Sequence, residues 1–445
     1  MNALLFAAWV AMVPAATPIS LEEARSQGRQ NTQALVSLLE ATRSAEDVRL
    51  ARSPLLPQLS LSSSVGGELI GRQRGPAILC NADRTVCEQR TVETDSQDRG
   101  NFRLSLDLTQ VIYDRVRWKQ LEQSGAVFEA ARGQAQEQAD TSELEAINRF
   151  FTLYRTQATL QVLEATVRRS EEQLERAQAL FEAGRVNRGE ELSARVNLGN
   201  DRINLLLRQA QLVQDRGLLA VWLARPGSEP LEAQAPESLL QPPPPPPSFE
   251  QAIAEARRRR PLLVALQQQV RAASLGREVA SAGYWPRLFA QGSYSRSGPE
   301  ARPVFATPRL QNTLSGAVVL QWDLFTGLST DAQVTQARAQ LRTAELNLAQ
   351  TDREVEAEVQ RTLQLLATQI ATAQLAAENR ETAARSLSLA EERFKAGAGS
   401  TLEVRDAQLK LTQSELTLLE NRVNVETARF AMMRAMGTLS PGESK

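Results

Sequence analysis

The 445-residue sequence contains no histidine, only two cysteines and few aromatic residues. Without histidine it lacks the commonest general base and the commonest metal ligand of proteins. It also has no nucleophile–base set, phosphate-binding loop or metal-ligating cluster, so nothing in it predicts an enzyme, a cofactor or a metal site. Acidic and basic residues nearly cancel, leaving a net charge of −1 and no basic surface that would favour nucleic acid.

Beyond its start, the sequence lacks any run of the roughly 20 apolar residues that a membrane-spanning helix needs. Residues 1–15 are typical of a secretory signal peptide, with an apolar stretch at 4–13 and small residues at Val13-Pro14-Ala15. A buried N-terminal helix is the alternative. No cysteine follows the expected cleavage site, which argues against a lipid anchor there. An exported chain of this kind can enter a membrane only through β-strands.

The most informative feature that is present is a duplication. Short segments recur in the same order in the two halves: Ser20-Leu21-Glu22-Glu23-Ala24 with Ser248-Phe249-Glu250-Gln251-Ala252, Leu56-Pro57-Gln58-Leu59 with Trp285-Pro286-Arg287-Leu288, and Phe181-Glu182-Ala183-Gly184 with Phe394-Lys395-Ala396-Gly397. These matches predict a first repeat over 16–240, a proline-rich linker over 241–248, a second repeat over 249–438 and a C-terminal tail over 439–445.

Each repeat has the same predicted order of elements. A helix (19–52 and 249–283) precedes two alternating stretches, and a very long helix (117–183 and 330–395) follows them. A glycine-containing turn then leads into a last helix (190–224 and 402–437). Apolar residues spaced by three and four, such as Val359, Leu363, Leu366 and Ile370, indicate coiled-coil packing. A long helix of this kind would span about 100 Å.

The alternating stretches predict membrane strands, although half-buried strands of a soluble sandwich remain an alternative. Apolar residues occupy every second position in each stretch: Leu59, Leu61 and Val65; Phe102, Leu104, Leu106 and Leu108; Leu288, Ala290 and Tyr294; Leu314, Val318 and Leu320. Four strands cannot close a sheet in lipid, since closed membrane sheets begin at about eight strands. Three copies would give a 12-stranded β-barrel with a lumen. The predicted fold class is therefore mainly α, with long coiled-coil helices forming a periplasmic α-barrel and four transmembrane β-strands per protomer in a trimer.

The two cysteines, Cys80 and Cys87, lie in a polar insertion that the second repeat lacks. In an exported protein, such a pair is expected to form a disulfide that closes a small loop.

The ordered set of motifs resembles the TolC-like outer-membrane efflux proteins over residues 19–438. The resemblance implies a homotrimeric duct in the outer membrane of a Gram-negative bacterium, in contact with membrane lipid and extending into the periplasm. It implies that substrates pass without chemical change, in efflux or in type I secretion. It also implies docking on a periplasmic adaptor (a membrane fusion protein) and an inner-membrane transporter. A structural periplasmic coiled coil and an adaptor subunit are the alternatives.

The resemblance also suggests a gate at the periplasmic entrance, formed by Glu403 and Asp406, with Glu190 as their counterpart in the first repeat. Rings of such acids would attract cations. The alternative is that these acids only favour the first turn of a helix. The basic latch residue of the family falls on Gly399, so that role is left open among Arg185, Arg188 and Arg405.

The two turns between the long helices are where the family meets its adaptor. The residues that the resemblance assigns to this contact are Gly184, Arg185, Val186, Gly397, Ala398 and Ser400. The alternative is that Gly184 and Gly397 are ordinary helix C-caps. A separate basic run at 257–260 is expected to be a solvated helix end rather than a binding site.

Overall fold

The computed structural model describes residues 16–439 except 84, 86, 240, 242–243, 301–303 and 306–311. The signal peptide expected at 1–15 lies outside the described residues, as does the tail beyond Leu439. The chain forms two compact units, and each draws on both predicted repeats. The helical unit comprises Met1–Arg43, Glu129–Gln269 and Glu345–Lys445, and the sheet unit comprises Ser44–Phe128 and Val270–Ala344.

The elements follow the duplicated order. They are β1 (Thr17–Ile19), α1 (Leu21–Gly28), α2 (Thr32–Arg52), β2 (Gln58–Ile70), β3 (Gln73–Cys80), β4 (Cys87–Thr94), β5 (Gln97–Tyr113), α3 (Arg115–Glu182), α4 (Arg188–Trp222), β6 (Leu231–Ala233), α5 (Phe249–Arg259), α6 (Pro261–Ala282), β7 (Arg287–Gly298), β8 (Asn312–Gln321), α8 (Ser329–Lys395) and α9 (Thr401–Ala435), with short 3-10 turns at Ser53–Leu55 and Glu237–Leu239. Within the described ranges, no helix is both long and apolar enough to cross a lipid bilayer.

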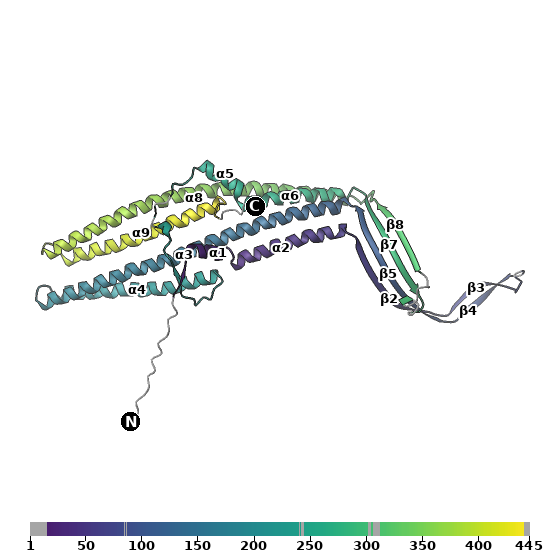
Figure 1. Cartoon of the computed structure of the whole chain (residues 1–445), viewed down its shortest axis with the longest axis horizontal. Coiled ribbons are helices and arrows are strands. Elements are labelled where there is room, and N and C mark those ends of the chain that lie inside the picture. The colour runs from purple at the N-terminus through teal and green to yellow at the C-terminus, as the bar shows by residue number, and fades with distance from the viewer. Residues whose placement is uncertain are drawn as a thin grey trace, which may run out of the picture. The chain divides into compact units, whose positions relative to one another are not determined.

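The four expected strands form one antiparallel sheet in the order β2-β5-β7-β8 (Figure 1). Its register aligns Leu61 with Leu106, Leu106 with Tyr294, and Tyr294 with Leu314. Because side chains alternate between the faces of a sheet, this register collects the apolar residues on one face. Serines 62, 105, 293 and 315 share the opposite, polar face. The apolar face is exposed, with Leu61 at 70% and Leu314 at 82% of full exposure.

A second hairpin, β3–β4, extends from the ends of β2 and β5 that lie away from the helices (Figure 1). Cys80 and Cys87 face each other in its last strand pair and are joined by a disulfide bond. Arg74 pairs with Glu93 across the two strands. An isolated two-stranded hairpin is only marginally stable in water, so this bond stabilises it at its tip.

We expect the disulfide to form in the exported protein. Mass spectrometry of unreduced peptides should show Cys80 and Cys87 in one cross-linked species, lighter by two hydrogens than the reduced pair. Free thiols at both positions in protein isolated from the envelope would contradict this.

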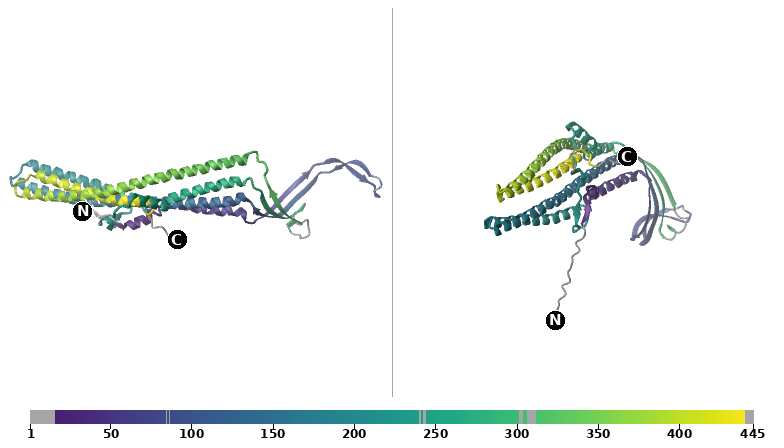
Figure 2. Two further views of the ribbon diagram at one scale, coloured as in Figure 1. Left: turned by 90° about the horizontal axis from the view of Figure 1, so that it is seen from above. Right: turned by 60° about the vertical axis from the view of Figure 1, so that its left-hand side comes forward.

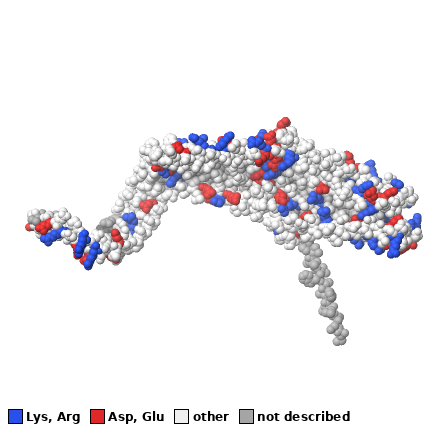
Figure 3. All heavy atoms as spheres, turned by 180° about the vertical axis from the view of Figure 1, so that it is seen from behind, with Lys and Arg blue, Asp and Glu red and all other residues white. Residues whose placement is uncertain are grey.

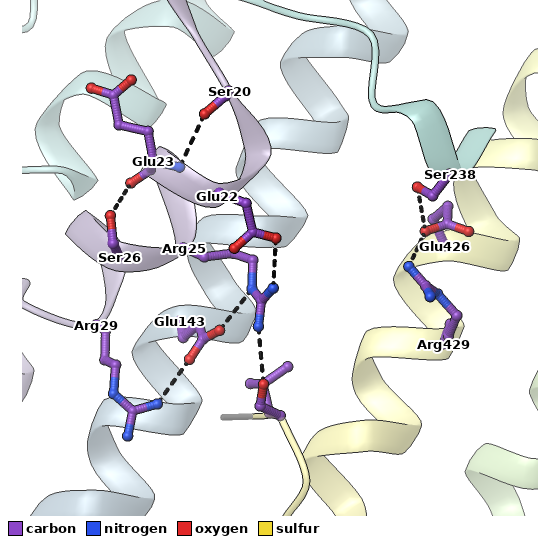
Figure 4. Close-up of polar contacts among 11 residues, drawn as sticks. Ser20, Glu22, Glu23, Arg25, Ser26, Arg29, Glu143, Ser238, Glu426 and Arg429 are labelled. Atoms are coloured by element: carbon purple, nitrogen blue, oxygen red, sulfur yellow. Dashed lines mark hydrogen bonds and ion pairs between the residues drawn. The ribbon is translucent and has the colours of Figure 1, made fainter. Parts of the chain in front are cut away.

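The core of the helical unit lies where α1, α3, α4 and α9 meet. Four side chains from the middle of α3 are fully buried there: Ile147, Phe150, Phe151 and Leu153. They belong to the same cluster as Leu219 of α4 and Phe430 of α9. Nearby polar contacts fix the surrounding segments (Figure 4). Glu143 accepts hydrogen bonds from Arg25 and Arg29, which ties α1 to α3, and Glu426 accepts one from Ser238, which ties the 3-10 turn to α9.

Both first helices of the repeats are broken, whereas the sequence predicted one helix in each case. The first break follows Gly28, where an added Cβ would lie 2.2 Å from the Cβ of Ala146. Asn31 then starts α2 by accepting a hydrogen bond from the amide of Ala34 at 2.9 Å. The second break is at Pro261, because proline disfavours the helical conformation in the residue before it, and Arg260 has ψ 119°.

The basic run at 257–260 is only partly a solvated helix end. Arg257, Arg258 and Arg259 are exposed, as predicted, but Arg260 is 2% exposed, so the prediction is wrong for that residue. Its guanidinium pairs with Glu358 at 2.6 Å and Glu137 at 3.4 Å, and Arg434 pairs with the same two carboxylates. The helix break turns Arg260 inward, and the cluster links α3, α8 and α9 across the two repeats.

Candidate functional site at the hairpin tips

The helices of the helical unit form two hairpins, α3–α4 and α8–α9, whose turns have the same geometry. Gly184 and Gly397 have φ of +69° and +73°. The following amides, of Arg185 and Ala398, donate to carbonyls five residues earlier at 2.8 and 2.9 Å, which is a Schellman C-cap. Both glycines are therefore helix C-caps, and the turn residues between the helices are largely exposed.

The predicted gate acids lie just beyond the second turn. The amide of Glu403 donates to the N-cap Ser400 at 3.2 Å, so this acid does occupy the first turn of α9. Both acids are exposed and have basic neighbours: Glu403 lies 3.8 Å from Arg393, and Asp406 lies 2.7 Å from Lys410. Their charge is therefore partly compensated within the chain.

Glu190 occupies the equivalent place at the start of α4. Its amide donates to the N-cap Asn187 at 3.1 Å, and its carboxylate accepts a hydrogen bond from Thr401 at 3.4 Å. The structure therefore brings Glu190 to the first residue of α9, beside the segment that carries Glu403 and Asp406.

A buried ion pair joins the two hairpins a short way from the tips, between the first turns of α9 and the middle of α4. Arg405 of α9 donates to both carboxylate oxygens of Asp201 on α4, at 3.0 and 3.1 Å. Ser170 of α3 accepts from Arg405 at 3.1 Å and donates to Asp201 at 2.5 Å. All three residues are buried. We call these three residues the hairpin clamp.

Sequence reasoning named Arg405 as one of three latch candidates but missed Asp201 and Ser170. Arg185 and Arg188 are exposed at the first tip, whereas Arg405 bridges the hairpins. A signal for Asp201 was present, because it follows Ala194 and Leu198 at the spacing of an apolar coiled-coil seam. A charged residue in such a seam needs a buried partner.

The hairpins lie side by side along much of their length (Figure 2). Thr166 of α3 and Thr412 of α9 share a buried hydrogen bond at 3.2 Å. Near the tips, the hairpins line a groove of about 780 Å³. Its walls include Leu180 of α3 and Phe394 of α8, and its lining contains Arg405 and Gln408 of α9.

A second apolar seam of α4 is left uncovered. Its residues are spaced by three, four or seven and are between 46% and 69% exposed: Leu192, Val196, Ile203, Leu206 and Val213. The opposite seam of α4, with Ala194, Leu198 and Leu219, is buried within the chain. A helix with two apolar seams is built to pack between two neighbours.

Charged side chains are distributed unevenly over the surface. On the face shown in Figure 3, Lys, Arg, Asp and Glu are interspersed over the helices, while the sheet surface is largely uncharged. Exposed aromatic residues gather where strands meet helices: of the five tryptophans and four tyrosines, Tyr113, Trp118, Tyr284, Trp285 and Trp322 lie there. Trp and Tyr of this kind favour the boundary between lipid and water.

Comparison with known structures shows the same fold in several outer-membrane channels. The CusC structure, described as showing transmembrane channel formation, has a TM-score of 0.77 and 18% identity over 94% of this chain and 92% of its own. VceC from Vibrio cholerae has a TM-score of 0.74 and 15% identity, over 94% and 96%. The open MtrE channel of Neisseria gonorrhoeae has a TM-score of 0.71 and 16% identity, over 96% and 91%. Comparison with curated proteins gives no match.

The sequence itself matches the family described as outer membrane efflux protein over residues 23–224 and 252–438, one segment in each predicted repeat. Together the two segments cover most of the chain. The chain therefore belongs to the outer membrane efflux protein family and is a channel rather than an enzyme.

Proposed function

We propose that three copies of this chain associate side by side and close one continuous duct, through which substrates leave the periplasm unchanged. The observation that carries this proposal is the sheet. Its apolar face is exposed, and its outer strands β2 and β8 have no partner on their outer edges among the described residues. In lipid such edges must be paired, and four strands are too few to close on themselves.

The helices support the same arrangement independently. The uncovered seam lies on α4, the last helix of the first repeat, and it needs an apolar partner over its whole length. A neighbouring copy supplies one if its α8 packs there, because α8 carries the exposed Leu365, Leu375 and Leu389. A single rotation axis then relates the three copies, both where their sheets pair edge to edge and where their helices pack together.

The oligomer is testable by native mass spectrometry of the protein in lipid nanodiscs. We expect a mass of three chains for the wild type and loss of that species for Leu206→Glu, which places a charge in the α4 seam. Arg208→Glu, on the same helix but outside the seam, is the matched control and should stay trimeric. A wild-type monomer in the nanodisc would contradict the proposed closure.

We infer that the tip turns bind a periplasmic adaptor, which connects the duct to an energised inner-membrane transporter. The six turn residues Gly184, Arg185, Val186, Gly397, Ala398 and Ser400 support this, because all but the half-buried Val186 are exposed at the ends of the hairpins and because the two turns repeat one geometry. A cysteine in place of Ala398 should cross-link to the adaptor in intact cells. Docking at the tips would be contradicted if neither this variant nor one with cysteine in place of Arg185 cross-linked to the adaptor.

We further propose that Glu403 and Asp406, with Glu190 nearby, line the entrance of the duct. Their exposure supports this role, but Lys410 and Arg393 weaken the expected cation preference. Lys410→Ala should therefore increase the cation-to-anion permeability ratio. The expected change is about twofold, since an exposed ion pair is worth roughly 0.2–1 kcal/mol.

The reversal potential of the reconstituted channel in a KCl gradient measures this ratio. Lys410→Arg keeps the charge beside Asp406 and serves as the control. An unchanged reversal potential in Lys410→Ala would place Asp406 away from the ion path.

A further inference from the structure

One arginine without a counter-ion lies where the strands of the sheet unit meet its helices. Arg115 is the first residue of α3, two positions after β5 ends at Tyr113. Its Cζ lies 4.7 Å from the ring centroid of Trp285, which comes two residues before β7. The side chain of Arg115 is half-buried, and among the described residues it has neither an ion pair nor a hydrogen bond. Its guanidinium N–H groups are therefore available to a ligand.

The acidic residues of this region do not neutralise Arg115, because each has another partner. The pairs are Asp114 with Arg117 at 3.3 Å, Glu278 with Lys119 at 3.0 Å, Asp323 with Arg287 at 2.8 Å, and Asp331 with the hydroxyl of Tyr284 at 2.5 Å. Glu122 also pairs with Lys119. Arg115 is thus a cation that needs an anion from outside the part of the chain that the structure describes.

The last apolar row of the sheet ends beside this arginine. The register aligns Tyr113 of β5 with Leu288 of β7, and Leu288 with Leu320 of β8, so these three residues share one face. Tyr113 is 39% and Leu320 64% exposed. Arg115 lies two residues beyond Tyr113, and Trp285 lies three residues before Leu288. A cationic group therefore stands at the edge of an exposed apolar surface.

The aromatic residues at this edge indicate the level of the lipid head groups. Trp285 is 50% exposed, and Trp322 beside it is 57% exposed. The indole N–H of Trp322 donates to the carbonyl of Tyr284 at 3.1 Å, whereas that of Trp285 has no acceptor in the described ranges. Tryptophan with an exposed ring favours the boundary between lipid and water. Two N–H donors without acceptors, on Arg115 and Trp285, thus lie at the level where a membrane carries its phosphates.

We propose that Arg115 and Trp285 bind the phosphate of a phospholipid whose acyl chains cover the row of Tyr113, Leu288 and Leu320. Because the helices extend into the periplasm, this lipid belongs to the periplasmic leaflet of the outer membrane. Phosphate oxygens accept from the guanidinium in a charge-assisted, two-pronged geometry and from the indole N–H. The Trp285 ring holds the guanidinium in place before the lipid arrives.

The bound lipid joins the two repeats, since Arg115 follows β5 and Trp285 precedes β7. It fixes the ends of these two paired strands at one depth in the membrane. Both donors come from the same copy of the chain, so the site does not depend on how many copies close the duct.

Phosphatidylethanolamine is the probe, because it carries a phosphate but no net charge, which avoids a general attraction between ions. It is titrated into the purified channel in detergent micelles, and native mass spectrometry counts the bound lipids. We expect one saturable lipid per chain for the wild type. Arg115→Gln should weaken binding about tenfold by removing a charge-assisted hydrogen bond. Trp285→Phe keeps a ring under the guanidinium but removes the N–H, and it should weaken binding about threefold.

Arg361→Gln, at an exposed position of α8 in the helical unit, is the matched control and should bind like the wild type. Diacylglycerol with the same chains lacks the phosphate, so it should bind equally weakly to the wild type and to Arg115→Gln. A thousandfold excess of inorganic phosphate should leave the lipid bound.

Equal binding of phosphatidylethanolamine to the wild type and to Arg115→Gln would overturn the proposal. Trp285→Phe takes the place of Arg115→Gln in this comparison if the latter does not assemble. Absence of saturable binding to the wild type would overturn the proposal as well. Displacement of the lipid by inorganic phosphate would do the same, since the site would then bind free phosphate rather than a phospholipid.

Discussion

Asp201→Ala should open the duct, increasing its open probability in planar bilayers at least tenfold. The substitution leaves the buried guanidinium of Arg405 without a carboxylate, and breaking a buried ion pair in this way costs about 3–5 kcal/mol. A free-energy change of about 1.4 kcal/mol shifts an equilibrium tenfold, so less than half of this cost is enough to raise the open probability tenfold. Separation of the hairpins relieves it by hydrating Arg405, so the open arrangement becomes favoured.

Two matched variants separate the clamp from general damage to the fold. Replacing both partners, Asp201→Leu with Arg405→Leu, removes the charges together, and apolar replacements of buried pairs are often neutral or stabilising. This double variant should conduct much like the wild type. Thr166→Val removes the hydrogen bond to Thr412, together with those to Val162 and Arg169, but leaves no buried charge unpaired, so it should have a small effect. A folded Asp201→Ala channel with wild-type open probability would show that the clamp does not hold the entrance.

Gly437→Ala should destabilise the protein by about 2–5 kcal/mol, through backbone strain and overpacking together. Gly437 has φ +69°, a conformation that alanine adopts only with strain. An added Cβ would lie 2.7 Å from both N and Cα of Arg260. These are backbone atoms at the α5–α6 break, and moving them would also pull Arg260 away from Glu137 and Glu358.

Thermal unfolding of the purified protein, followed by circular dichroism, measures the effect of Gly437→Ala. The matched control is Gly125→Ala within α3, where an added Cβ meets nothing within 4 Å. Because glycine lowers helix stability, the control should be stabilised by about 0.5–1 kcal/mol. If Gly437→Ala melted at or above the wild-type temperature, the contact of the C-terminal turn with Arg260 would be wrong.

Periodic features were predictable from the sequence. Strict alternation around Leu61, Leu106 and Leu314 predicted the four strands, and spacing by three and four predicted the long helices. The mainly α fold, the family, the efflux-channel function and the outer-membrane location are confirmed. The boundaries of the repeats and the roles of the site residues stay predictions.

Features that depend on contacts between distant residues could not be predicted. Asp201 and Arg405 are 204 positions apart, and no local pattern pairs them. The break at Arg260 arises from a single proline, and the break after Gly28 falls where the backbone packs closely on Ala146; an apolar periodicity registers neither feature. The β3–β4 hairpin was also missed as strands, since its sequence is polar and only the pair Cys80 and Cys87 indicated a closed loop.

The most direct test of the central claim is the conductance, in a planar lipid bilayer, of purified protein in which Glu403 and Asp406 are both changed to Ala. If three copies close a duct whose entrance these acids line, the variant should form stable conducting pores that are less selective for cations than those of the wild type and less sensitive to block by divalent cations. Folded, membrane-inserted protein that conducts no ions would contradict the account.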